Sequence, residues 1–160
     1  MRELILSDIQ IPKIGEGRRG TEAPIGYLLR QASTAHRTQF EKILSDLNVT
    51  LPQFSVLKVL SLYPGISNAD LARMCLLTPQ TISVIVKNLK RMEALSSRPH
   101  AIHGRIQHLD LTPAGKKLLS QCDKRVDVFQ TSLSAGLSAA EEKVIKQWLI
   151  KVASQCTEES

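Results

Sequence analysis

Six side chains between positions 80 and 91 fall on one face of a helix at 3.6 residues per turn. They are Gln80, Thr81, Val84, Lys87, Asn88 and Arg91. In the major groove of DNA, amide and ammonium groups hydrogen-bond to base edges, and an exposed aliphatic group contacts the methyl of thymine. A solvated helix face uses the same polar residue types, so the surrounding elements must decide between the two readings.

Positive charge is concentrated around this helix. The 160-residue chain has a formal net charge of +6 and a pI of about 9.4. Residues 73–117 contain eight Lys or Arg against two Asp or Glu, while the segments on either side are nearly balanced. A local basic excess is typical of a surface that binds an anionic partner.

The helix that carries the six residues is predicted to begin after the cap Thr78, with proline at its first position, and to extend to about Ala94. Its inward stripe is predicted to be Ile82, Ile85, Val86, Leu89 and Met92. A short helix opened by a Ser67–Asp70 capping box precedes it. Two extended runs, 95–98 and 105–111, follow it and predict a hairpin with its tip at 99–104.

Four further helices complete the pattern. They are predicted to begin near Ile25, near Pro52, after Thr112 and after the capping box Ser138–Glu141. Residues 1–24 have no apolar period and are predicted to be an extended arm. The expected fold is mainly α with a small β-hairpin wing, namely a winged helix-turn-helix with a helical dimerisation region.

Several segments together resemble the MarR (multiple antibiotic resistance regulator) family of transcription regulators. They are Leu51–Leu57, Asn68–Arg73, Leu77–Ser83, and Arg105 with Leu109–Gly115. The resemblance covers residues 26–152 and implies one domain over 25–160. Within it we expect a winged helix at about 50–112 and dimerisation helices at about 25–48 and 113–155.

The resemblance implies a homodimer that binds a pseudo-palindromic double-stranded operator. Apolar residues at 3-4 spacing on the long fifth helix predict a helix-pairing seam. The predicted dimer interface consists of Leu119, Cys122, Val126, Phe129 and Leu133, with Trp148 from the last helix.

The predicted DNA contacts come from the short helix, the recognition helix and the wing. They are Ser67, Asn68, Thr78, Gln80, Thr81, Ser83, Val84, Lys87, Asn88, Arg91, Arg98, His103 and Arg105. Two positions depart from the family pattern. His103 stands where the wing has an Asp, and Ala94 stands where a Gly follows the recognition helix. Ala carries a steric cost in a left-handed cap, so we expect a different helix end.

The resemblance also implies that the regulator is a repressor released by a small ligand, such as an aromatic acid. By position, Arg30, His36, Arg37 and Phe54 are the candidates to line its cleft. An Arg or His can pair with a carboxylate while aliphatic side chains cover the ring. The same side chains also suit an ordinary helix surface.

Two alternative functions remain open from the sequence. One is a redox-sensing regulator acting through cysteine oxidation, and the other is a winged-helix protein-interaction module without sequence-specific DNA binding. The three cysteines, Cys75, Cys122 and Cys156, do not form a disulfide framework or a metal knuckle.

The sequence also favours several absences. No enzyme motif is present, so no catalytic role, cofactor or metal site is predicted. No apolar run approaches the roughly 18–20 residues of a membrane span, so no membrane partner is expected and the predicted location is cytoplasmic.

Overall fold

The computed structural model describes residues 11–99 and 107–157. By its internal contacts, the chain divides into two compact units, 1–42 and 43–160. The first unit contains the 3-10 helix η1 (Gly17–Arg19) and most of helix α1 (Ile25–Leu44). Residues 13–22 form turns around η1, so this part of the predicted extended arm is folded back on itself.

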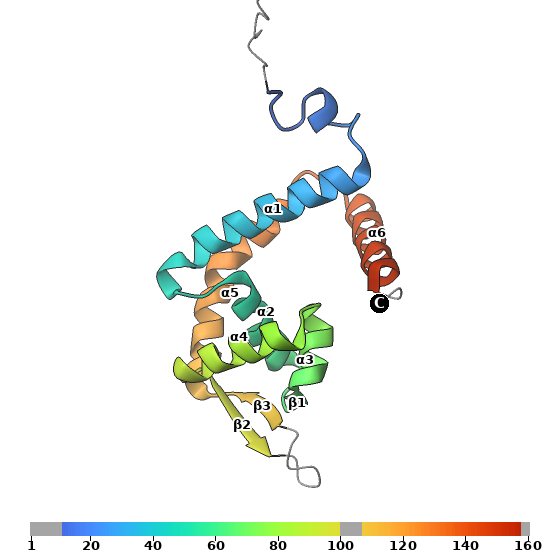
Figure 1. Cartoon of the computed structure of the whole chain (residues 1–160). Coiled ribbons are helices and arrows are strands. Elements are labelled where there is room, and N and C mark those ends of the chain that lie inside the picture. The colour runs from blue at the N-terminus through green and yellow to red at the C-terminus, as the bar shows by residue number, and fades with distance from the viewer. Residues whose placement is uncertain (1–10, 100–106, 158–160) are drawn as a thin grey trace, which may run out of the picture. The chain divides into compact units, whose positions relative to one another are not determined.

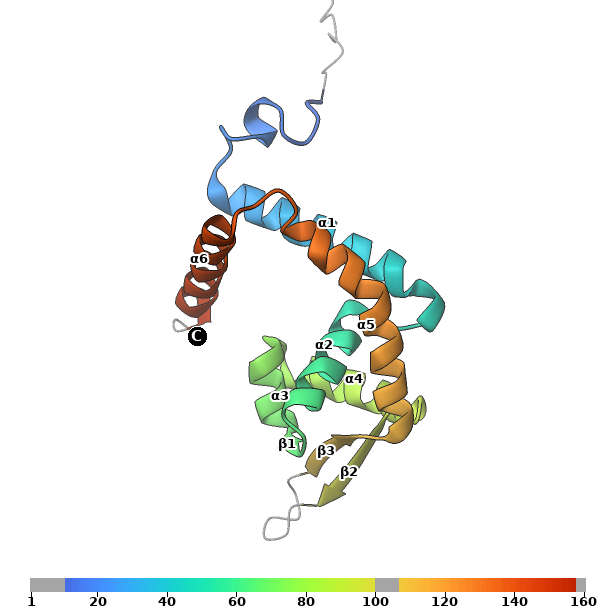
Figure 2. The same ribbon diagram turned by 180° about the vertical axis from the view of Figure 1, so that it is seen from behind.

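The second unit contains the elements that the sequence predicts for a winged helix. In chain order they are η2 (Ser45–Leu47), α2 (Leu51–Leu62), β1 (Ile66–Ser67), α3 (Asn68–Cys75), α4 (Pro79–Arg91), β2 (Leu95–Pro99), β3 (Gln107–Leu111), α5 (Pro113–Leu133) and α6 (Ala139–Thr157). Helices α2, α3 and α4 pack on one another, and α2 also packs against α5 and β3 (Figures 1 and 2). The described part therefore has the predicted order of helices with a hairpin between α4 and α5. No helix in the described ranges is long and apolar enough to cross a membrane.

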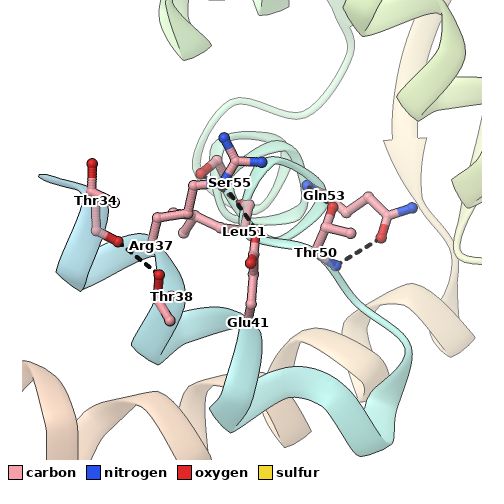
Figure 3. Close-up of polar contacts among 8 residues, drawn as sticks. All are labelled: Thr34, Arg37, Thr38, Glu41, Thr50, Leu51, Gln53 and Ser55. Atoms are coloured by element: carbon pink, nitrogen blue, oxygen red, sulfur yellow. Dashed lines mark hydrogen bonds and ion pairs between the residues drawn. The ribbon is translucent and has the colours of Figure 1, made fainter.

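Side-chain caps fix where the helices begin. Thr50 and Gln53 form a capping box at α2, with Thr50 N donating to Gln53 Oε1 at 2.9 Å (Figure 3). The hydroxyls of Ser67, Thr78 and Thr112 accept from backbone N–H groups at the starts of α3, α4 and α5. These bonds satisfy donors that the first helical turn leaves without partners, which confirms the predicted helix starts.

The sheet has the order β1–β3–β2, with antiparallel neighbours. Strand β1 was not predicted, because two residues are too few to show a period of two. The predicted first strand ended at Arg98 and the second began at Arg105. The structure extends β2 to Pro99 and begins the described part of β3 at Gln107. The intervening residues 100–106 lie outside the described ranges.

The end of α4 differs from the prediction. The helix ends at Arg91 rather than near Ala94, and Met92 is exposed rather than inward. Glu93 takes the left-handed conformation with φ of 56°, while buried Ala94 donates from its N–H to Leu89 O at 2.9 Å. The steric cost expected at Ala94 therefore falls on Glu93 instead.

The exit of α4 is joined to the start of α5. Thr112 N donates to Ala94 O at 3.1 Å, and Thr112 Oγ1 donates to Glu93 O at 2.6 Å. A Cβ on Gly115 would lie 2.0 Å from Ala94 O, so only glycine permits this approach of the two backbones.

Candidate nucleic-acid interface

Helix α4 has one buried face and one exposed face. Ile82, Ile85, Val86 and Leu89 are buried and anchor it, as the sequence predicts. The opposite face exposes Gln80, Thr81, Ser83, Val84, Lys87 and Arg91, and Asn88 is half-buried at its edge. Val84 keeps 60% of its surface exposed. The buried apolar face therefore packs α4 against the rest of the unit, while its polar face remains accessible to solvent.

Several polar groups on this face already have partners within the chain. Ser83 Oγ donates to Pro79 O at 2.8 Å, and the hydroxyl oxygens of Thr78 and Thr81 lie 2.9 Å apart. Asn88 Oδ1 accepts a hydrogen bond from the Arg91 guanidinium. These bonds limit what the same atoms can offer to a ligand.

Gln80 and Lys87 differ from those neighbours. Within residues 11–99 and 107–157, neither the Gln80 amide nor the Lys87 ammonium has a hydrogen-bond partner. Both side chains are exposed. Together with Val84 they are exposed groups of the polar face of α4 that have no described partner within the chain.

The start of α3 contributes fewer free groups than predicted. Ser67 Oγ donates to Asp70 Oδ2 at 2.6 Å and accepts from Asp70 N at 3.2 Å, so its hydroxyl serves as the cap. The bond from Ser67, with a second from Arg73, lowers the pKa of Asp70. Asn68 is exposed beside this cap.

A basic hollow lies between α3 and α4. It has a volume of about 480 Å³ and is lined in part by Asn68, Lys87, Lys90 and Arg91. Lys90 was not among the predicted contacts, although its i,i+3 spacing from Lys87 places the two on adjacent turns. Its ammonium donates to Ser97 Oγ at 2.7 Å, which connects α4 to β2. The hollow thus has three positively charged side chains in its lining, Lys87, Lys90 and Arg91.

The wing presents Arg98 on β2. Its Nε donates to Asp110 Oδ2 on β3 at 3.1 Å, so the guanidinium is exposed but tethered. The other two predicted wing contacts, His103 and Arg105, lie outside the described residues. The described part of the wing thus places one arginine on the same unit as the basic hollow.

The predicted effector residues are divided between the two units. In the first unit, Arg30 lies over the Tyr27 ring at 5.6 Å, His36 packs against Phe40 with ring centroids 4.6 Å apart, and Arg37 pairs with Glu41 at 2.9 Å. Phe54 belongs to the second unit and is buried.

The predicted dimer seam needs correction in its first half. Leu119, Cys122 and Val126 are buried within a single chain, with exposed fractions of 7%, 0% and 2%, so they belong to its core. The 3-4 spacing identified an apolar face but not the neighbour that covers it. Leu133 and Trp148 remain exposed, and Phe129 is half-buried.

The cysteine environments do not favour a reactive thiolate. Burial raises the pKa of Cys75, and burial together with the Asp123 carboxylate raises the pKa of Cys122 to about 11. Oxidation proceeds through the thiolate, which a raised pKa disfavours at neutral pH. Cys156 is exposed near the end of α6.

Comparison with known proteins connects this geometry to a group of regulators. A family model described as MarR family matches residues 47–106. An HTH-type transcriptional repressor of Mycobacterium tuberculosis is 32% identical over 133 residues, which cover 83% of this chain and 96% of the relative.

Solved structures show the same fold. BpsR of Bordetella bronchiseptica, studied for regulation of its DNA binding by 6-hydroxynicotinic acid, is 26% identical with a TM-score of 0.73. The alignment covers 81% of this chain and 98% of that protein. The DNA complex of S. aureus MepR is 24% identical with a TM-score of 0.78, covering 86% and 99% of the two chains.

Proposed function

This chain belongs to the MarR family of DNA-binding transcription regulators, and we propose that it is a homodimeric repressor released from a pseudo-palindromic operator by a small organic acid. The observation that carries the DNA-binding part is α4, whose apolar face is buried while Gln80, Val84 and Lys87 are exposed and without described partners. A helix of this kind fits the major groove. Because such a regulator acts on the chromosome, we place it in the bacterial cytoplasm.

A salt titration on selected DNA tests this proposal. The purified protein selects duplexes from a random pool, and fluorescence anisotropy measures their affinity at about 50 and 200 mM salt. If the basic hollow and wing contact several phosphates, affinity falls by orders of magnitude between these concentrations. Lys87→Ala weakens binding, whereas Lys143→Ala, an exposed lysine on α6, serves as the matched control. Failure to enrich any duplex contradicts the proposal and favours a protein-interaction module.

The dimer is supported by apolar side chains that one chain leaves uncovered. On α6, four of the exposed apolar residues share one side of the helix: Val144, Ile145, Trp148 and Leu149. Water contact with this much apolar surface is unfavourable, and a second copy of the chain would cover it.

The release by a ligand is supported by a second hollow within the second unit. It has a volume of about 610 Å³, with Leu60, Leu111 and Leu119 among its apolar lining and Lys116 and Lys124 among its polar lining. An aromatic acid would place its ring on the leucines and its carboxylate near a lysine. Three aspartates also line the hollow, and two of them are paired: Asp110 with Arg98 and Asp123 with Lys58.

A ligand in this hollow would act on the wing through Asp110, which both lines the hollow and holds Arg98. The probe is 6-hydroxynicotinic acid, added to the protein–duplex complex while anisotropy is followed. Lys124→Ala is expected to raise the concentration needed for release. If Arg30→Ala has that effect instead, the ligand binds at the predicted α1 side chains. If the acid does not release the wild-type protein, it is not an effector.

A further inference from the structure

Some polar side chains on the exposed face of α4 have a hydrogen-bond partner within the chain and others have none described, and we assign the two groups different roles. We propose that Gln80 and Val84 read the bases, selecting an adenine and a nearby thymine, and that Asn88 acts only by positioning Arg91. This inference rests on the proposed function and specifies the DNA sequence that it requires.

Gln80 is equipped to recognise adenine. Its amide offers both a donor and an acceptor, which match N7 and the N6 amino group of adenine on the major-groove edge. The side chain lies in the first turn of α4, is exposed, and has no described hydrogen-bond partner that would compete.

Val84 is equipped to recognise thymine. The residue is 60% exposed in the middle of an otherwise polar face and is not among the buried core residues. In the major groove, thymine alone presents a methyl group, and contact with it would remove both apolar surfaces from water. The exposed valine therefore favours a thymine at the position it reaches.

The spacing of the two residues predicts the spacing of the two bases. Gln80 and Val84 are one helical turn apart, a rise of about 6 Å. Successive base pairs rise by about 3.4 Å, so the two contacts fall about two base pairs apart. Each half-site is thus expected to contain a contacted adenine and a contacted thymine at that separation.

Asn88 is less free than Gln80 to recognise adenine, because its carbonyl oxygen already has one partner. Reading adenine requires the amide oxygen as acceptor and the amide nitrogen as donor. In Asn88 the Oδ1 already accepts from the Arg91 guanidinium. That bond fixes the arginine toward the side of the helix that holds Lys87 and Lys90. The structure assigns Asn88 a positioning role, in place of the base contact predicted from the sequence.

Replacement of single thymines by deoxyuridine tests the Val84 assignment, because it removes only the methyl group. On the selected duplex, wild-type protein is expected to lose about three- to fivefold in affinity at one thymine of each half-site, as for one lost methyl contact. Val84→Ala is expected to be insensitive to the same replacement. Thymines flanking the half-sites provide the DNA control, and an unchanged Tm shows that the exposed substitution leaves the fold intact.

Matched changes test the other two residues. Replacement of the contacted adenine by 7-deazaadenine removes N7, and its effect is expected to disappear in Gln80→Ala. For Asn88, the double variant Asn88→Ala/Arg91→Ala is expected to bind no more weakly than Arg91→Ala. Asn88→Ala is also expected to weaken selected and random duplexes by the same factor.

Three outcomes overturn the assignment even when a duplex is bound. They are a wild-type protein indifferent to every deoxyuridine, a Val84→Ala variant as sensitive as wild type, and an Asn88→Ala variant that loses affinity only for the selected duplex. If no duplex is selected at all, the proposed function itself has failed, which separates the two results.

Discussion

Arg98 Nε and Asp110 Oδ2 lie 3.1 Å apart across the two strands of the wing, joining residues twelve positions apart in the chain. Both side chains retain contact with solvent, so the pair orients the arginine and is not part of the buried core. The carboxylate fixes where the arginine points while the guanidinium stays exposed on the wing.

Removing this pair is expected to change DNA binding more than stability. Because the pair is exposed, Arg98→Ala and Asp110→Ala should each lower the free energy of unfolding by less than about 1 kcal/mol, as urea denaturation measures. Arg98→Ala should reduce the salt slope of DNA binding by about one unit, since one phosphate contact is lost. An unchanged slope would show that Arg98 does not touch phosphate.

Gly115 is expected to tolerate no side chain. Gly115→Ala drives a Cβ into Ala94 O, and overpacking of this kind costs about 1–3 kcal/mol. Gly26→Ala is the matched control, because a Cβ there meets nothing within 4 Å and alanine favours a helix. Thermal unfolding of both variants checks the contrast, and equal Tm values would contradict it.

The helix caps predict a loss of stability in acid. Ser67 lowers the pKa of Asp70, and Ser138 lowers the pKa of Glu141. The ordinary pKa values of these two carboxyl groups, taken for the unfolded chain, are 3.8 and 4.5. Because folding lowers both pKa values, the carboxylates stabilise the folded state above the ordinary values. This stabilisation is lost as the pH falls through the lower pKa values of the folded chain. Ser67→Ala and Ser138→Ala should therefore flatten the decline of Tm below about pH 4.5, relative to wild type.

Cys122 predicts a loss of stability in alkali. Burial raises the pKa of this thiol from its ordinary value of 9.0, which we take for the unfolded chain, to about 11 in the folded chain. Between these values the unfolded thiol loses its proton first, so stability falls as pH rises from 9 toward 11. Cys122→Ala should remove this slope from urea denaturation curves. In the native protein at pH 8, a thiol reagent should modify Cys156 faster than Cys122, and the reverse order would show that Cys122 is accessible.

The uncovered face of α6 predicts the oligomeric state. Sedimentation should give about twice the 17.7 kDa chain mass at micromolar concentration. Ile145→Asp/Leu149→Asp places charge on two exposed apolar positions and should shift the protein toward monomer. Lys151→Asp, also exposed on α6, is the control for added negative charge. A double variant that stays dimeric locates the interface elsewhere.

The helical part of this fold follows from the sequence because period and caps are local signals. Apart from Met92, spacing predicts the buried and exposed faces of α4, and residue type predicts the caps Ser67 and Thr78. The Arg98–Asp110 pair was not, because a cross-strand contact depends on register, which residue types do not specify.

The hydrogen bond between Asn88 and Arg91 on α4 also could not be predicted from the sequence. Asn88 and Gln80 are both amides on the polar face, and only coordinates show that Arg91 occupies one of them. The burial of Cys122 within one chain is a third case, because helical spacing cannot tell an internal neighbour from an external one.

The bonds from Thr112 to Glu93 and Ala94, closed over by Gly115, make a stiff joint between α4 and α5. A stiff joint transmits rotation, so turning α5 about this point turns the recognition helix with it. In a dimer with two such joints, the distance between the two α4 helices would depend on the orientation of the two α5 helices. If α4 reads DNA as proposed, a movement of α5 would change the separation of the two α4 helices in the dimer without altering the side chains on either of them.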